Sequence, residues 1–498
     1  MDHCASVLLA FPPEDVLADH AAYNKAAKTH IAKINQLFKD QGPAIAANAQ
    51  SLLDCLNPQV HSISYLAILD CLLPTPTDLR QSPYQYDEGL AERIILFLCR
   101  FDPIQIRYYG VPFTTLFTTV SSGQIMPAPV AVPLLANALL RVDPSGSMLT
   151  SNHLMLMGLA YFSEVTEPTV AVTDKSIIYY PNMVNQPDPR TIMLCDPNLP
   201  PSSYVTKDTG LTTRLTPLQV IEYDWLVGLS RCSRRDWSGA REAFGRAASH
   251  PCRDAGISRA MVEAFKKWVL VSLLDEGRVS GPAPPHASER VAKAHALLAL
   301  PYVHIAEEFL GSGNGAALRR CVEASQAQLV EDGNEGLVRE VLQSHQKWQI
   351  VRLRDVYARI SLSEVRERTK SAVTGEPAAS DAELAALIES MVASGMLQAA
   401  IEPPISGGGA GVPCLVFLNG DDNRPEHELA SQIQHAAERI NRLSLEYRAT
   451  KERLATSKEF IRLAIKDQKR DKDTKDTCFD FNAMEDEDIM SEMTPGNL

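Results

Sequence analysis

The sequence lacks the residue patterns on which many enzymes depend. It has no HxH or HExxH pair for zinc, no GxxxxGK[ST] for phosphate and no GxSxG for a nucleophilic serine. The glycine-rich stretches Gly311–Ala316 and Gly407–Gly411 do not open a helix after a strand, so we interpret both as loops. Isolated histidines such as His153 are expected to be hydrogen-bonded core residues. The sequence therefore predicts no catalytic residues, no cofactor and no metal site.

Paired cysteines are also absent. Ten cysteines are scattered singly without a CxxC pair, and most lie in apolar helical contexts, such as Cys99 in RIILFLCRF. A free thiol in such a place behaves as a small hydrophobic side chain, which is typical of a cytosolic or nuclear protein. The N-terminal MDHCASVLLAFPPED lacks a basic region and its apolar run ends at Pro12, so a signal peptide is not expected.

Charged side chains are missing from Tyr108 to Leu140. The length would allow a membrane span, but Pro112, Pro127, Pro129 and Pro133 would each remove a backbone donor inside the bilayer. We therefore expect a buried turn between core helices here, and no membrane insertion. Basic residues are also outnumbered in the whole chain, where 48 Lys and Arg face 61 Asp and Glu. The resulting net charge of −13 opposes a general affinity for nucleic acid or acidic lipid.

Helical periodicity is what the sequence has in abundance. From Glu14 to Leu300, apolar residues recur every three or four positions in segments such as EDVLADHAAYNKAAKTHIAKINQLF and SNHLMLMGLAYFSEV. Strand-like exceptions are Ser176–Tyr180 and Thr191–Cys195, in a proline-rich connection. A chain of 498 residues is long enough for about three domains. The sequence thus predicts a mostly α protein with several domains.

The clearest repeat unit is Pro217–Pro251. One helix is expected to end near Ser230 and a second to begin near Ser238 as its N-cap. Small and aromatic residues there follow the spacing of a tetratricopeptide-type hairpin, and they are Gly228, Ala240, Phe244 and Ala247. Successive hairpins of this kind stack as a right-handed helical-repeat solenoid. An irregular helical domain without true repeats is the alternative.

After Val351 the pattern changes to that of a winged helix. Ser361 is expected to start a short helix, Ser380 to cap DAELAALIESMVASG, and Gly395 to end that helix in the left-handed conformation. MLQAAIE and PCLVFL are then typical of the two strands of a hairpin. Helix, helix, helix and two-stranded wing is the order of a winged-helix domain.

The charge of this segment argues against nucleic acid. A winged helix that binds nucleic acid needs Lys or Arg on its third helix and wing, yet none occurs from Ser371 to Asn423. Open strand edges suit pairing with a neighbouring protein instead. The residues predicted to bind a partner at the winged-helix edge are Met396, Leu397, Ala399, Ile401, Leu415 and Phe417.

A long helix is predicted at 425–470. A narrow apolar stripe recurs every seven residues, which is typical of a helix that packs lengthwise on other helices. The stripe residues predicted to bind partners in a helix bundle are Ile433, Ile440, Tyr447, Leu454 and Ile461. Packing of this helix against its own chain is the alternative. The acidic tail past Lys475 is expected to be disordered, although FDFNAMEDEDIMSEM could also hold a short docking motif.

The order of solenoid, winged helix and long helix resembles the PCI family, named after the proteasome lid, the COP nine signalosome and translation initiation factor three. ISLSEVRERT and IESMVASGMLQAAIE are similar to the PCI segment of that family, and LTSNHLMLMGLAYF and MVEAFKKWVLVSLLDEGRV are similar to its signalosome branch. The glycine-rich wing loop and the insert Pro181–Pro201 depart from the family pattern.

The resemblance implies a non-catalytic scaffold subunit of the complex that removes the ubiquitin-like modifier Nedd from cullin-RING ligases, in cytoplasm and nucleus. It implies other PCI-domain subunits and a zinc-metalloprotease subunit as partners, with neither nucleic acid nor membrane. A PCI subunit of the proteasome lid is the alternative, and a nucleic-acid-binding protein is less favoured. The expected division is a helical repeat region at 1–216, a solenoid at 217–350, the winged-helix part of a PCI domain at 351–422, a bundle helix at 425–470 and a disordered tail at 471–498.

Overall fold

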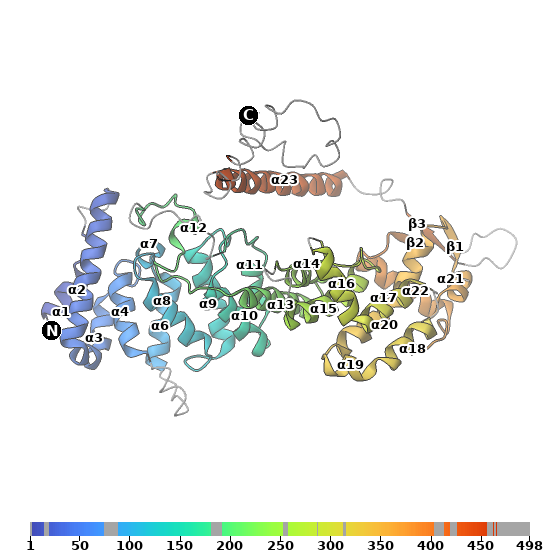
Figure 1. Cartoon of the computed structure of the whole chain (residues 1–498), viewed down its shortest axis with the longest axis horizontal. Helices are drawn as coiled ribbons and strands as arrows, with labels where there is room; N and C mark the ends of the chain where they lie inside the picture. Colours follow the sequence, from blue (N-terminus) through green and yellow to red (C-terminus); the bar gives the residue numbers. More distant parts are fainter. Residues whose placement is uncertain are drawn as a thin grey trace, which may run out of the picture. The chain divides into compact units, whose positions relative to one another are not determined.

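The structure of the chain is a computed structural model, drawn in Figure 1. It divides into two units by its internal contacts, unit 1 at Met1–Phe417 and unit 2 at Leu418–Leu498. The residues that the structure describes are 2–13, 19–73, 88–180, 192–251, 257–285, 287–311, 315–402, 413–418, 426–455, 462 and 465.

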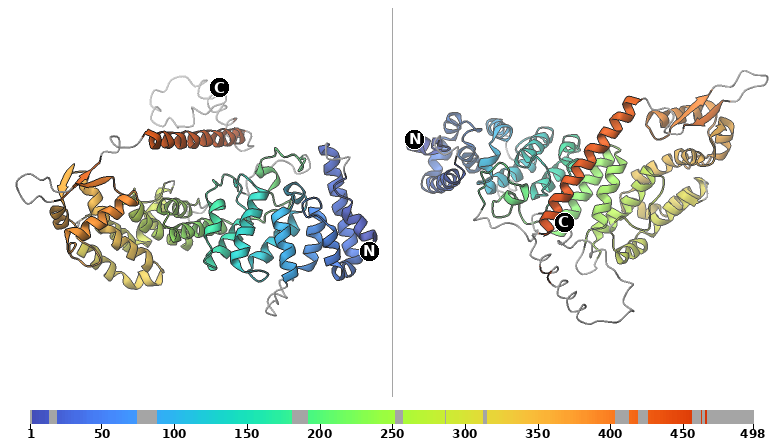
Figure 2. Two further views of the ribbon diagram at one scale, coloured as in Figure 1. Left: turned by 180° about the vertical axis from the view of Figure 1, so that it is seen from behind. Right: turned by 90° about the horizontal axis from the view of Figure 1, so that it is seen from above.

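Unit 1 is mostly helical, as the sequence predicts. Its helices follow one another in chain order, from the blue α1 to the orange winged helix, in all the views of Figure 1 and Figure 2. The first half contains α1 (Asp2–Leu9), α2 (His20–Ala47), α3 (Ala49–Cys55), α4 (Ser62–Leu72), α6 (Glu88–Arg100), α7 (Pro103–Ile106), α8 (Gly110–Ser121), α9 (Ala128–Val142), α10 (Ser151–Phe162), the 3-10 helix η2 (Glu167–Thr169), α11 (Val170–Thr173) and α12 (Pro201–Tyr204). The second half contains α13 (Pro217–Ser233), α14 (Trp237–Ala248), α15 (Arg259–Asp275), α16 (Glu289–Leu298), α17 (Leu300–Gly311), α18 (Gly315–Ala324), α19 (Gln326–Glu331) and α20 (Glu335–Leu353), and then the winged helix.

The uncharged stretch Tyr108–Leu140 folds mainly into α8 and α9, so the expectation of a turn holds only for the link between them, where Ile125 and Met126 are buried. Its prolines mostly begin helices. Pro127 caps α9 and Pro129 lies in its first turn, where a missing N–H costs nothing. Pro112 is the third residue of α8, and Pro133 lies in the interior of α9. In the part of the chain that the structure describes, no helix is long and apolar enough to cross a membrane.

The two expected strands before α13 do not form. Tyr179 makes a single parallel bridge with Met148, and the described residues from 192 to 195 contain no strand. The bridge cannot lengthen into a ladder because Thr150, two residues after Met148, is already the N-cap of α10.

Residues 192–212, which we call the strap, run back over the N-terminal helices. The Cys195 thiol donates to the backbone oxygen of His20 at 3.2 Å. The buried guanidinium of Arg107 donates to the backbone oxygens of Leu194 at 3.1 Å and Asp196 at 2.8 Å. The helix start at Gly110 lies so close to the strap backbone that a Cβ there would collide with it. The strap therefore completes the N-terminal core.

The hairpin of α13 and α14 confirms the predicted close helix contact. A Cβ at Gly228 would lie only 2.6 Å from Cε1 of Phe244, so the missing side chain is what admits the ring. The predicted N-cap Ser238 is wrong, because it lies inside α14: the N-cap is Asp236, two residues earlier, which accepts from the N–H of Gly239 at 3.1 Å. α14 packs on both α13 and α15, as in a helical-repeat solenoid.

Buried charges join three elements of the solenoid. The Lys266 ammonium on α15 donates to Asp332 at 2.7 Å and to Glu263 at 2.9 Å. The Tyr302 hydroxyl on α17 donates to the other oxygen of Asp332 at 2.8 Å, and Lys267 pairs with Asn334. This network fixes α15 and α17 to the turn that precedes α20.

The winged helix consists of β1 (Arg359–Ser361), α21 (Leu362–Arg368), α22 (Asp381–Ala393), β2 (Ala399–Glu402) and β3 (Cys414–Phe417). Ser361 caps α21 and Ser380 caps α22, as predicted. Gly395 has φ +74° after α22, also as predicted. The two-stranded wing is joined by β1, which the sequence did not reveal, and the strand order is β1-β3-β2 with both pairs antiparallel.

Three of the four core clusters follow the chain order of unit 1. One lies under α1–α12, one under α13–α20, and one inside the winged helix. A further cluster joins Leu149 and Met157 to Tyr223 and Val227, so packing continues across residue 217. The predicted boundary between a helical repeat region at 1–216 and a solenoid at 217–350 remains a prediction.

Unit 2 contains α23 (Glu426–Ala455). Its 30 residues correspond to about 45 Å of helix. The remainder of the predicted bundle helix and the acidic tail lie almost entirely outside the described residues.

Candidate protein-interaction surfaces

Among the described residues, no group of three His, Cys, Asp or Glu side chains is arranged to hold a metal ion. The ring nitrogen Nδ1 of His153 lies 2.8 Å from the Thr150 hydroxyl, and burial lowers the pKa of His153 to about 3. His153 is the hydrogen-bonded core residue that the sequence predicts.

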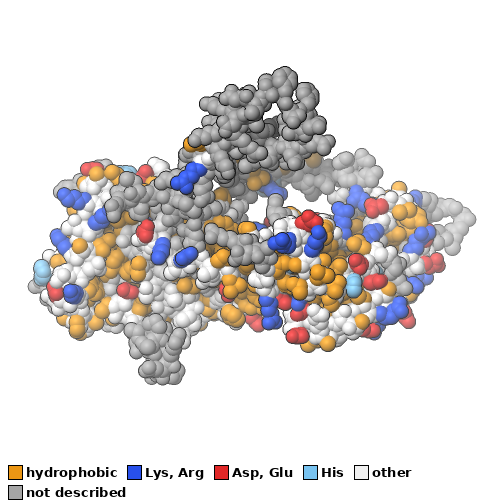
Figure 3. Space-filling model, in the orientation of Figure 1, with side chains coloured by type: hydrophobic (Ala, Val, Ile, Leu, Met, Phe, Trp, Pro, Cys, Tyr) orange, Lys and Arg blue, Asp and Glu red, His pale blue; other side chains and the backbone are white. Residues whose placement is uncertain are grey.

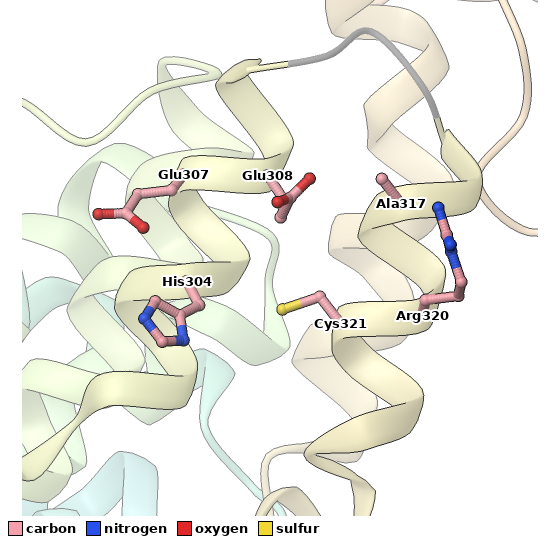
Figure 4. Close-up of a pocket in the computed structure, with 6 residues that line it drawn as sticks. All are labelled: His304, Glu307, Glu308, Ala317, Arg320 and Cys321. Atoms are coloured by element: carbon pink, nitrogen blue, oxygen red, sulfur yellow. The ribbon is translucent and has the colours of Figure 1, made fainter.

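A groove of about 510 Å³ separates α17 from α18. Figure 4 shows Glu308 and Cys321 directed into the space between the helices, and His304 and Glu307 of α17 also line the groove. Burial, followed by the charges of Glu308 and Glu307, raises the pKa of the Cys321 thiol. The thiol is therefore disfavoured as a nucleophile, because a nucleophilic cysteine needs a lowered pKa.

The predicted wing residues are mostly part of the winged-helix core. Four of the six side chains are at most 6% exposed, and they are Leu397, Ala399, Leu415 and Phe417. Met396 and Ile401 are partly buried against the same cluster. These side chains stabilise the winged helix, since alternate residues of each strand face the helices.

The prediction that both wing strands offer open edges is wrong for β3. β3 pairs with β1 on one side and with β2 on the other, so its backbone groups are engaged along both edges. β2 is the outer strand on its side of the sheet. Glu402 at the end of β2 pairs with Arg359 of β1 at 2.9 Å. A partner strand could therefore add at β2, through backbone groups rather than through the six named side chains.

The apolar stripe of α23 is exposed in unit 2. Ile433, Ile440 and Tyr447 are 61%, 63% and 58% exposed, and Leu443 lies beside them at 57%. The side chain of Leu454 and the whole of Ile461 lie outside the described residues. A soluble helix of this length normally buries such a stripe against other helices. The role of these residues in binding partners remains a prediction.

Sequence reasoning missed a second exposed apolar cluster in the solenoid. Leu297 and Leu298 end α16, Leu300 begins α17, and all three are exposed. On the face drawn in Figure 3, hydrophobic side chains gather over α16 and the start of α17. The run HALLALPYV has the composition of a core segment, so only the helix break at Ala299 could have suggested that these side chains face outward.

Known proteins are similar to this chain over most of its length. A family model described as the N-terminal helical repeats of COP9 signalosome complex subunit 3 matches residues 26–195. The chain is 37% identical over 471 residues to the COP9 signalosome complex subunit 3 of Neurospora crassa, which covers 94% of this chain and 92% of that protein. The protein of the same name from Emericella nidulans is 29% identical over 437 residues, or 85% of this chain and 84% of the relative. That of Arabidopsis thaliana is 24% identical over 322 residues, 63% of this chain and 64% of the relative.

These similarities agree with the architecture. The family model falls on the N-terminal helices, and the solenoid leads into a winged-helix PCI domain. The identity to the Neurospora protein extends over nearly the full length of both chains. The chain belongs to the COP9 signalosome complex subunit 3 family.

Proposed function

We propose that this chain is a non-catalytic scaffold subunit of the COP9 signalosome. Membership of the subunit 3 family supports the complex. The helical solenoid supports the scaffold role, because stacked helical repeats present extended surfaces to partners.

In this role the chain holds other subunits in a complex that removes the ubiquitin-like modifier Nedd from cullin-RING ligases. Its partners are other PCI-domain subunits and the zinc-metalloprotease subunit that performs the cleavage. Cullin-RING ligases are reached through the assembled complex, in cytoplasm and nucleus. The acidic third helix and wing, which have no Lys or Arg from Ser371 to Asn423, support protein partners over nucleic acid.

The observation that carries the proposal is the exposed stripe of α23. Side chains such as Ile440 and Tyr447 place apolar area in water that a bundle with partner helices would bury. The β2 edge supplies a second attachment point, since its position at the side of the sheet suits strand addition by a neighbouring winged helix.

Assembly is tested by recovering the tagged full-length chain from its native cells and identifying its partners by mass spectrometry. A chain truncated after Asp422 is the comparison. The proposal predicts a stoichiometric set of PCI proteins with one zinc metalloprotease, lost on truncation. Recovery of the full-length chain without such partners would contradict the scaffold role.

The absence of catalysis is tested on the purified chain alone. Incubation with a Nedd-conjugated cullin is expected to give no cleavage, with or without added zinc. Metal-dependent turnover by the isolated chain would overturn the proposal of a non-catalytic subunit.

A further inference from the structure

Three leucines project from the bend between α16 and α17. Leu297 is 71% exposed, Leu298 56% and Leu300 46%, although they follow one another within four residues. Isolated exposed leucines are common on protein surfaces, but adjacent ones form a patch that is more often functional. We call these three residues the leucine knob.

The face of α17 that begins at the knob continues to the groove between α17 and α18. Leu300, His304 and Glu307 are spaced by four and three residues, so they lie in one line along the helix. From Leu300 to Glu307 the helix rises by about 10 Å. The groove of about 510 Å³ opens beside this line, and Glu308 points into it (Figure 4).

The groove end of this surface has a surplus of negative charge. No ion pair to Glu307 or Glu308 occurs among the described residues. Arg320 donates to the backbone oxygen of Ala316 at 3.3 Å, and in Figure 4 its side chain points away from α17. Arg319 on the same helix pairs with Glu323 at 2.9 Å. The two carboxylates are thus left for a cation from outside.

We propose that the leucine knob and the adjoining α17–α18 groove form a docking surface for an amphipathic helix of another protein. The partner helix places apolar side chains on the knob and a Lys or Arg about seven residues further on, beside Glu307 and Glu308. The apolar contacts supply affinity, while the carboxylates select the basic residue and fix the direction of the helix. This surface lies on the solenoid rather than on the β2 edge, and it extends the proposed function to a third attachment point.

The test uses the full-length chain in its purified native complex, with the photocrosslinking residue benzoylphenylalanine in place of Leu298. Irradiation is expected to attach a helical segment of another protein that carries apolar residues and a Lys or Arg within two turns. Glu308→Lys in the same chain should lower the yield of that product at least fivefold, because it places like charges together. Glu92→Lys, the same change at an exposed site on α6, should leave the yield unchanged.

Four outcomes would overturn the proposal. These are no crosslink to any other chain, a crosslink to a second copy of this chain, capture of a segment without Lys or Arg, and a yield that Glu308→Lys does not change. Loss of the product upon Glu308→Lys counts as support only if the variant still enters the complex and unfolds at the same temperature. Entry into the complex through α23 is a separate readout, so failure here leaves the scaffold proposal standing.

Discussion

At the scale of single residues, Gly228 sets the separation of α13 and α14. Gly228→Ala would place a Cβ 2.6 Å from the ring of Phe244, so the helices must move apart. We expect a loss of about 1–3 kcal/mol in the free energy of unfolding, the usual cost of overpacking. Thermal unfolding of the purified chain measures it.

The matched control is Gly158→Ala in α10, where nothing lies within 4 Å of an added Cβ. That change removes a glycine from a helix and should stabilise the chain by about 0.5–1 kcal/mol. If the two substitutions shifted the unfolding temperature equally, close packing at Gly228 would not be what limits the hairpin.

Buried histidines make stability depend on pH. Burial lowers the pKa of His30 to about 4, of His153 to about 3 and of His345 to about 4. The unfolded chain binds a proton at each below about pH 6.5, whereas the folded chain does not until near pH 4. The unfolded state thus binds more protons. Lowering the pH from 7 to 5.5 should therefore reduce the free energy of unfolding by about 1 kcal/mol per histidine. Urea unfolding at the two pH values checks this.

His153→Gln isolates one of these contributions. Glutamine at the third helical position can still complete the capping box with Thr150 but does not titrate. In this variant, the free energy of unfolding should fall by about 1 kcal/mol less between pH 7 and pH 5.5 than it does in the unsubstituted chain. An unchanged difference would mean that His153 is not a source of the pH dependence.

Some buried polar residues could be predicted from the sequence, and others could not. His153 could be placed in the core because it lies on an apolar helix. Lys266 and Lys267 could not, since lysine is almost always exposed and their partners Asp332 and Asn334 lie more than sixty residues away. Only the fold brings these groups together, so local pattern gives no indication of them.

At the scale of elements, β3 is the centre of the wing rather than its edge. Leu415→Ala should destabilise the winged helix by about 2–5 kcal/mol, because this side chain is fully buried. Val416→Ala on the same strand should cost less, since Val416 is only half-buried. Hydrogen exchange of peptides from the winged helix distinguishes the two. Equal protection in both variants would contradict the core role of Leu415.

The stripe of α23 should act in assembly without supporting the fold of unit 1. The double variant Ile440→Asp, Tyr447→Asp introduces charge where the bundle would bury apolar area, so at least tenfold less of the partner subunits should co-purify. His435→Asp, on the opposite side of the helix, is the control and should recover partners normally. Full recovery with the double variant would show that the stripe does not enter a bundle.

Elements with strong local signals could be predicted, and those that depend on distant partners could not. Ser361, Ser380 and Gly395 act through hydrogen bonds or φ values within a few residues, and the structure confirms each. β1 has three residues and exists only because β3, more than fifty residues later, pairs with it. The apolar run Ser176–Tyr180 has strand composition but no partner long enough to form a ladder. The six wing side chains were predicted to bind a partner, but the sheet order places them in or against the winged-helix core.

At the scale of the whole molecule, unit 1 should fold without α23. All four core clusters draw their residues from Met1–Phe417. A chain truncated after Asp422 should therefore unfold within about 2 °C of the full-length chain, since no buried apolar area of these clusters is removed. Differential scanning calorimetry gives the comparison. A substantially lower unfolding temperature would show that unit 2 contributes to the stability of unit 1.

The strap also makes the N-terminal core depend on residues that are synthesised much later. The hydrogen bond from Cys195 to His20 joins residues 175 positions apart, and those from Arg107 to Leu194 and Asp196 join residues almost 90 positions apart. At about 5–20 residues per second, the ribosome needs on the order of 10 to 35 seconds to add the 175 residues between His20 and Cys195. During this interval α2 has no strap to contact, and Arg107 lacks its two carbonyl partners while the last 87 to 89 residues are added. The N-terminal core therefore cannot be complete until the strap residues have been synthesised.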